Sequence, residues 1–232
     1  MNNLLGAKQI ETDRLLLKVP TMDEQRQLWD ILRREDVNKY YFPTPDRIFD
    51  KYGLDKTKVD DLLRARVLFQ AQLDDWERQE KFYQKKIEDI QNGENSQKFT
   101  WSIFLKDGTV IGQMTVQPCD KYPDSPEVRD VGWYIDPNYH KNGYATEAAK
   151  AILDYMFNEV CIDKIITSAA TINPGSWKIM EKLGFEFIGT KTSTYLDADN
   201  NILELSCYSV TREKYLKEGK KLVKEGNNNS AL

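Results

Sequence analysis

The first part of the chain changes from a two-residue hydrophobic period to a helical one. Residues 10–19 alternate apolar Leu15 and Leu17 with more polar neighbours up to a proline, which predicts a first strand. Thr21 and Glu24 then have the spacing of a capping box, the signal for a helix start. The apolar residues behind them recur at helical spacing: Leu28, Trp29, Ile31 and Leu32.

The next segment combines an aromatic stretch with the longest helical pattern. Residues 39–53 contain two prolines and five aromatics, which predicts an ordered loop or short turns. Residues 57–92 contain neither Gly nor Pro. Their apolar side chains lie on one helical face, and many of the other positions are charged. An unbroken helix here would be about 54 Å long, so we expect a break near residues 70–75. We interpret the charges as a solvated helix face.

The rest of the chain predicts strands that enclose two helices. Asp107-Gly108 between two apolar runs is a hairpin signal. A strand–helix–strand unit makes the strand over 162–171 parallel to that over 128–135. The expected elements are strands over 99–105, 109–116 and 128–135, a helix over 143–159 and a strand over 162–171. A helix with Asn173 as N-cap and Pro174 at N1 follows and ends at Leu183-Gly184; antiparallel strands over 185–196 and 200–211 and a charged tail complete the chain.

Composition restricts the classes of protein to which the chain can belong. With 232 residues, 40% of them hydrophobic, it can bury one substantial core but is short for two domains. A formal net charge of −4 argues against a nucleic-acid partner, because such surfaces carry a basic excess. No apolar run is long enough to span a bilayer and the start lacks the segments of a signal peptide, so we expect a soluble cytoplasmic protein without a membrane partner.

The few cysteine and histidine residues exclude several kinds of site. Cys119, Cys161 and Cys207 are odd in number and widely spaced, which argues against a disulfide framework and a Cys-based metal site. His140 is the single histidine, so a His-rich zinc site and a relay of two histidines are excluded. No metal site is therefore assigned.

Residues 130–150 form the stretch that carries candidate chemistry. Their pattern predicts a strand, a turn that contains Gly143, and an alanine-rich helix. Free amides and the positive end of the helix dipole make such a helix start an anion site, and phosphate is the commonest anion to use one. A strand, turn and helix without any ligand is the alternative, because this unit is common in α/β proteins.

Three segments in order resemble a known family. The run His140-Lys141-Asn142-Gly143-Tyr144-Ala145 resembles the phosphate loop Q/R-x-x-G-x-G/A of the GNAT superfamily of acetyl-CoA-dependent N-acetyltransferases. Asn173 and Ser176, followed by Lys182–Phe185, resemble a second block of that family. Glu11–Leu15 resembles the start of its Rim-type branch, which contains ribosomal-protein alanine N-acetyltransferases.

The resemblance implies an α/β (α+β) fold. We expect a GNAT-like mixed, mostly antiparallel twisted sheet of six to seven strands, with a central splayed parallel pair, flanked by helices. Residues 1–212 would form a single GNAT domain with a helical insertion at about 43–75, and residues 213–232 a charged C-terminal tail. The protein is expected to be a monomer or a homodimer.

The resemblance also implies an activity, namely transfer of an acetyl group from acetyl-CoA to a primary amine by direct attack in a ternary complex. The acceptor would be a protein N-terminus or a small-molecule amine. The alternative is a GNAT-fold sensor or scaffold that binds acyl-CoA without turnover. The implied cofactor-binding residues are Tyr134, Ile135, His140, Lys141, Asn142, Gly143, Tyr144, Ala145, Thr146, Asn173 and Ser176. His140 departs from the family pattern of Gln or Arg, and either replaces one side-chain contact or is a solvated loop residue.

Three residues are candidates for catalysis. Asp130 occupies the place where many members carry a glutamate base, and strand alternation puts it on one face with Gly132 and Tyr134; the alternative is a solvated strand-start residue. Met180 stands where many members have a tyrosine acid. Ser176 and Tyr195, which match residues of the Rim-type branch, are the remaining donors for the thiolate, although Ser176 at position N3 could serve only as part of the helix cap.

Overall fold

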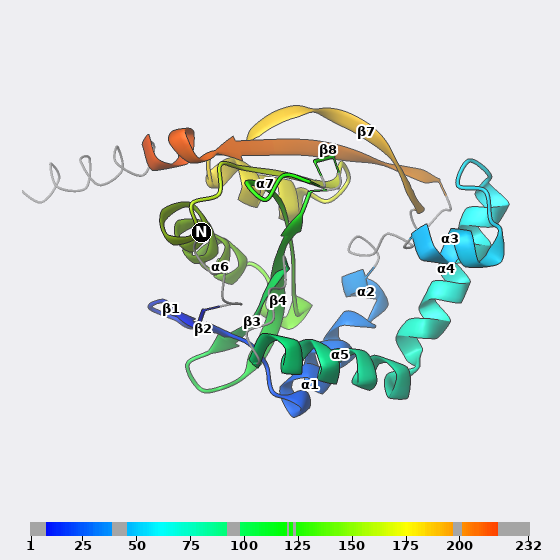
Figure 1. Ribbon diagram of the computed structural model, residues 1–232, viewed down its shortest axis with the longest axis horizontal. Coiled ribbons are helices and arrows are strands. Elements are labelled where there is room, and N and C mark those ends of the chain that lie inside the picture. The colour runs from blue at the N-terminus through cyan, green and yellow to red at the C-terminus, as the bar shows by residue number, and fades with distance from the viewer. Residues whose placement is uncertain are drawn as a thin grey trace, which may run out of the picture.

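The computed structural model describes residues 8–38, 46–91, 98–119, 121–122, 124–196 and 201–217, and Figure 1 shows their arrangement. Within these residues the strands form one eight-stranded sheet in the order β1-β2-β3-β4-β5-β6-β8-β7. Their bounds are β1 Ile10–Glu11, β2 Leu15–Lys18, β3 Phe99–Leu105, β4 Val110–Pro118, β5 Val128–Ile135, β6 Lys164–Ala170, β7 Glu186–Leu196 and β8 Ile202–Thr211. The expected mixed, mostly antiparallel sheet with one parallel pair is confirmed, and it is wider than six to seven strands.

The extra strand arises because the predicted strand over residues 10–19 is two strands. The chain reverses after β1, and Ile10 pairs with Leu17 in an antiparallel register. Thr12 forms the reversal, because its amide donates to the Leu15 carbonyl at 3.0 Å and its hydroxyl accepts the Leu15 amide at 2.9 Å. A hydroxyl that bonds nearby backbone in this way favours a turn over a continuous strand. Leu15 and Leu17 are fully buried, as their alternation predicted.

The parallel pair of β5 and β6 opens soon after it starts. Its ladder contains two residue pairs, Val128 with Lys164 and Arg129 with Ile165. Beyond them the Thr167 hydroxyl donates to the Val131 carbonyl at 2.7 Å, so a side chain replaces the backbone ladder. Because the strands are parallel, the opening lies toward their carboxyl ends, where the helices that follow them begin. The expected splay is therefore confirmed.

Helices cover both faces of the sheet (Figure 1). Their bounds are α1 Met22–Leu32, α2 Glu35–Asn38, α3 Asp46–Tyr52, α4 Val59–Asp74, α5 Trp76–Gln91, α6 Tyr144–Tyr155 and α7 Pro174–Lys182, with a π-helical turn at Met156–Val160 that extends α6. The main apolar core lies between the sheet and α6 and α7, and a smaller one lies under α1. Of the helices described here, none is long and apolar enough to cross a membrane.

The helices α3, α4 and α5 form an arm that leaves the sheet and returns to it (Figure 1). The expected break is confirmed, because Asp75 between α4 and α5 has extended backbone. The interpretation of residues 39–53 as loop or turns is wrong for 46–52, which form α3; Ile48 and Phe49 bury its apolar side against α4. Residues 39–45 lie outside the described part. Leu196 at the end of β7 joins this cluster, so the arm contacts the far hairpin of the sheet.

Candidate active site

The turn between β5 and α6 is shaped so that its backbone amides lie at the start of a helix. Asp136 begins the turn, and its carboxylate accepts the Asn138 amide at 3.0 Å. Lys141 and Gly143 then have φ values of 63° and 81°, the left-handed region in which glycine costs least. Gly143 is the N-cap of α6, and no side chain caps that helix. The first amides of α6 therefore remain for an anion, together with the helix dipole.

Two side chains of the turn bond its own carbonyls. The His140 Nε2 donates to the Ile135 carbonyl at 2.8 Å, which fixes the proton on that nitrogen because a carbonyl only accepts. The Asn142 amide donates to the Tyr139 carbonyl at 3.2 Å and to the His140 carbonyl at 3.1 Å. These bonds hold the turn rigid without using its amides. His140 thus bonds the end of β5 while the residue remains exposed.

A cluster around Glu147 ties this turn to the N-terminal hairpin. The Glu147 carboxylate accepts the Thr12 hydroxyl at 2.6 Å, the Arg14 Nε at 2.6 Å and the Arg14 amide at 3.1 Å. The Arg14 Nη1 donates to the Asn142 carbonyl at 3.0 Å, and the guanidinium stacks on the Tyr144 ring at 4.7 Å. Burial raises the pKa of Glu147, but these hydrogen bonds outweigh it and hold the pKa below its usual value.

Sequence reasoning missed this cluster as a part of the site. The available signal was an acidic residue in the first turn of a helix, where the dipole favours a negative charge. The partners Thr12 and Arg14 are more than 130 positions away.

The second wall of the opening is the start of α7. Asn173 has the predicted N-cap position and Pro174 follows it at N1, but no side chain bonds the first amides of this helix. Instead, the Asn173 Nδ2 donates to the Ser176 Oγ at 3.3 Å, and the Ser176 amide donates to the Asn173 carbonyl at 3.2 Å. Met180, one turn further along, is 2% exposed and belongs to the apolar core. Two uncapped helix starts therefore follow the two strands that splay.

The remaining candidates lie on or beside the sheet face opposite α6. Tyr134 is buried against α1, and its hydroxyl donates to the Leu28 carbonyl at 3.4 Å, whereas Val131 and Ile135 belong to the core under α6. The predicted alternation along β5 is thus confirmed. Asp130 is half-buried, and its carboxylate accepts the Gln117 amide at 3.5 Å. Tyr195 belongs to β7, but its side chain lies outside the described part of the structure.

Lys86 on α5 departs from the interpretation of residues 57–92 as a solvated face. Lys85 fits that interpretation, because it bonds Asp89 at i,i+4 with 3.1 Å between the atoms. Lys86 instead turns inward, and its Nζ donates to the Thr100 hydroxyl at 3.0 Å. Burial lowers the pKa of Lys86 to about 7, and the charge of Lys98 adds to the effect. Its position one residue before buried Ile87 was the signal that sequence reasoning missed.

Comparisons with known proteins agree with this geometry. Residues 14–186 match the family described as Acetyltransferase (GNAT) domain. A stretch of 93 residues is 37% identical to the uncharacterized N-acetyltransferase YnaD of Bacillus subtilis, covering 40% of this chain and 51% of that protein. The chain thus spans about half the length of the curated relatives that it matches.

Two solved structures show the likeness in fold. The ribosomal-protein-S5-alanine acetyltransferase of Vibrio fischeri has a TM-score of 0.63 at 14% identity, with 90% of this chain and 98% of that chain covered. The spermidine N-acetyltransferase of Vibrio cholerae, solved with CoA and spermine, has a TM-score of 0.61 at 14% identity, with 88% and 99% covered.

Proposed function

Because the chain belongs to the GNAT acetyltransferase family, we propose that it transfers an acetyl group from acetyl-CoA, the donor that this family uses, to a primary amine. The observation that carries the proposal is the pair of uncapped helix starts, at Gly143 and Asn173, at the carboxyl ends of two splayed parallel strands. This is where open α/β sheets bind phosphate-bearing ligands. Both helix starts have amides to offer an anion and neither is occupied by a capping side chain.

The residues of the turn fit the phosphates of such a donor. We assign the amides of Asn142 to Thr146 to the pyrophosphate, because the turn's other polar groups are already bonded internally. Gly143 lies beside the Arg14 guanidinium, which is 3.5 Å from the position a Cβ would take, so a cation adjoins these amides. Backbone groups of Tyr134 and Ile135 lie where β5 leaves β6, and would pair with the pantetheine arm.

The acceptor chemistry requires two proton transfers. Acetyl-CoA supplies a thioester when it is bound. An ammonium acceptor first loses one proton to the Asp130 carboxylate through a water molecule. Its lone pair then forms a nitrogen–carbon bond with the acetyl carbonyl while the carbon–sulfur bond breaks. The proposed donors, Ser176 at the start of α7 and Tyr195, give a proton to the leaving thiolate, and the second proton lost by the nitrogen replaces it on the donor, so that the products are the amide and the thiol.

Calorimetric titration with acetyl-CoA tests the donor site. Saturable binding is expected, and absence of binding at millimolar ligand would refute the proposal. Thiol release with a panel of peptides and small amines then tests turnover. Ser176→Ala is expected to lower kcat while the affinity for acetyl-CoA changes little, and Ser125→Ala, in the loop before β5, is the matched control. An unchanged kcat would remove Ser176 from the mechanism.

The second candidate is a protein that binds acyl-CoA without turnover. The buried Met180 favours it, because an apolar core residue at this position cannot protonate a thiolate. Calorimetry and thiol release together separate the two functions. Binding of acetyl-CoA without thiol release under every acceptor would establish the sensor and exclude the transferase.

A further inference from the structure

A charged cluster lies on the sheet face that carries Asp130. Lys86 reaches it from α5, Lys98 reaches it from the residue before β3, and Asp130 lies on β5. Burial lowers the pKa of both lysines; the charge of Lys98 lowers that of Lys86 further, and the charge of Asp130 partly offsets the lowering at Lys98, so the three groups interact electrostatically. Two lysine side chains thus lie near one carboxylate on the sheet face of the proposed acceptor site.

Strand register places the Lys86 ammonium relative to β5. The Lys86 Nζ lies 3.0 Å from the Thr100 hydroxyl, which lies 3.4 Å from the Thr115 hydroxyl. Thr100 pairs with Thr115 across β3 and β4, and Thr115 pairs with Gly132 across β4 and β5. Thr100, Thr115 and Gly132 therefore form a row across the three strands. Gly132 ends the row without a side chain, between Asp130 and Tyr134 on the same sheet face. Since neighbouring strands are ~4.8 Å apart, the ammonium stands about 10 Å from Gly132.

Within the described part of the chain, the Lys86 Nζ has no carboxylate within 4 Å. A half-buried charge without a partner is costly, and a second cation nearby increases that cost. Thr100 accepts one hydrogen bond but carries no charge. An anionic group from a ligand would remove the cost, whereas a polycation would increase it.

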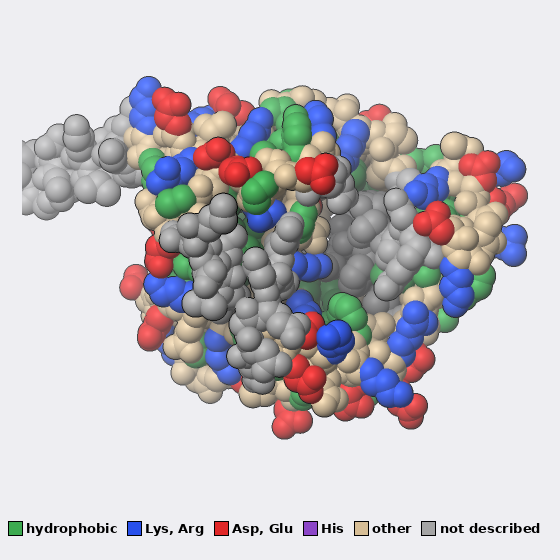
Figure 2. Space-filling model, in the orientation of Figure 1, with side chains coloured by type: hydrophobic (Ala, Val, Ile, Leu, Met, Phe, Trp, Pro, Cys, Tyr) green, Lys and Arg blue, Asp and Glu red, His purple; other side chains and the backbone are tan. Residues whose placement is uncertain are grey.

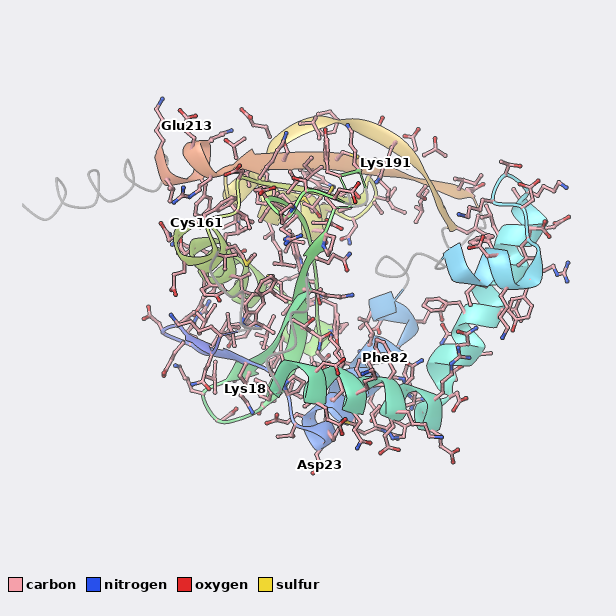
Figure 3. The ribbon with its side chains drawn as sticks, in the orientation of Figure 1. Lys18, Asp23, Phe82, Cys161, Lys191 and Glu213 are labelled. Atoms are coloured by element: carbon pink, nitrogen blue, oxygen red, sulfur yellow. The ribbon has the colours of Figure 1, made fainter. Side chains whose placement is uncertain are left out.

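Lys and Arg side chains gather beside this cluster. In Figure 2 they lie along the hollow between the sheet and the arm. In Figure 3, Lys191 on β7 and Phe82 on α5 lie on opposite sides of this hollow. Phe82 is 59% exposed, although it is a large apolar side chain. Leu196 at the end of β7 packs with apolar residues of α3 and α4.

We propose that Lys86, with Lys98 beside it, binds the carboxylate of the acceptor, so that the acceptors are small amino acids and not polyamines. The proposal rests on the proposed acetyl transfer and names its substrate class. The reacting amine would lie at Asp130. The carboxylate would lie beside Lys86, on the other side of the Thr100 and Thr115 hydroxyls. A separation of this size favours a carboxylate several bonds from the amine over one on the adjacent carbon.

Matched amines test the proposal by acetyl transfer from acetyl-CoA. The ω-amino acids from β-alanine to 6-aminohexanoate are compared with n-alkylamines of equal length and with spermidine. The expected kcat/KM is at least tenfold higher for the best ω-amino acid than for its alkylamine. An alkylamine or spermidine used equally well would overturn the proposal, even though acetyl transfer itself would be established.

Variants on α5 provide the matched control. Lys86→Met is expected to abolish the preference for the carboxylate, so that kcat/KM for the best ω-amino acid falls to that for its alkylamine while the affinity for acetyl-CoA is unchanged. Lys85→Met, which removes the neighbouring solvated lysine, is expected to leave the preference intact. A preference that survives Lys86→Met refutes the assignment.

A binding measurement covers the case in which no amine is acetylated. Calorimetry with 5-aminovalerate is carried out on the complex with CoA, for the wild type and for Lys86→Met. Binding that is lost in Lys86→Met supports the carboxylate site even if the transferase function fails. Absence of binding to the wild type overturns the proposal, whatever the outcome for acetyl-CoA.

Discussion

Replacement of Glu147 by Gln tests whether the N-terminal hairpin holds the phosphate turn in place. The carboxylate accepts three hydrogen bonds, from the Thr12 hydroxyl and from the Arg14 Nε and amide. A glutamine keeps one acceptor oxygen but presents an NH₂ group to donors that need an acceptor. Arg14, which also bonds the Asn142 carbonyl at 3.0 Å, would lose its anchor.

The expected cost follows from the exposure of the two partners. The ion pair is 2.6 Å long, and the side chains of Arg14 and Glu147 are 49% and 20% exposed. Hydrogen bonds to a charged group contribute about 1.5–3 kcal/mol when they are well buried, and exposed ion pairs contribute about 0–1 kcal/mol. Glu147→Gln should therefore lower the free energy of unfolding by about 1–2 kcal/mol at pH 7. It should also weaken acetyl-CoA binding, since the turn is less well held.

Urea unfolding of the wild type and the variant at several pH values measures this effect. Because the folded state depresses the pKa of Glu147, its contribution is complete above the carboxyl's usual pKa and is lost as pH falls through the folded-state pKa. The difference between the two proteins should thus shrink toward acid. Glu159→Gln is the control, because its pair with Lys8 is more than half exposed on both sides. A Glu147→Gln loss no larger than that of the control, or one independent of pH, would refute the reasoning.

Three further substitutions have outcomes that the structure determines. Lys86→Met should raise the free energy of unfolding at pH 6 by about 1–3 kcal/mol. This gain should fade as pH rises from 7 toward 10, because the wild-type lysine, with a pKa of about 7, becomes neutral in the folded state. A gain that is constant with pH in urea unfolding contradicts this. Arg129→Met should stabilise by about 1–3 kcal/mol in thermal unfolding, because the Nε and Nη1 of this buried guanidinium have no hydrogen-bond partner among the described residues. Gly143→Ala should cost about 1–2 kcal/mol and weaken acetyl-CoA binding in calorimetry, because φ is 81° while the added Cβ meets no atom closer than 3.5 Å.

Local signals predicted the parts of the fold that local chemistry decides. The capping box of Thr21 and Glu24 is present, with both reciprocal bonds. The N-cap position of Asn173 and the break between α4 and α5 are also where the sequence places them. Each of these features depends on residues within a few positions of one another. Chain reversals that rely on one hydroxyl, such as that of Thr12, carry a weaker signal, and there the strand prediction was wrong.

Features that depend on distant partners were not predictable in this way. The carboxylate of Glu147 bonds residues of the N-terminal hairpin, and the ammonium of Lys86 meets Thr100 only because α5 packs on that face of the sheet. Helical periodicity places Lys86 near the border of the apolar face, where a lysine normally extends its ammonium into water. Only the position of β3 under α5 decides that it turns inward.

The two halves of the proposed site therefore differ in how they are built. The donor half comes from one continuous stretch, residues 136–147, braced by Arg14. The acceptor half collects Lys86, Asp130 and the arm from separate segments, and the described contacts of the donor turn include neither α3 nor α4. Changes in the arm can thus alter which amine is accepted while the geometry of the donor turn stays the same. This separation explains why the sequence identifies the donor readily, whereas the acceptor has to be inferred from charges that converge only in the folded chain.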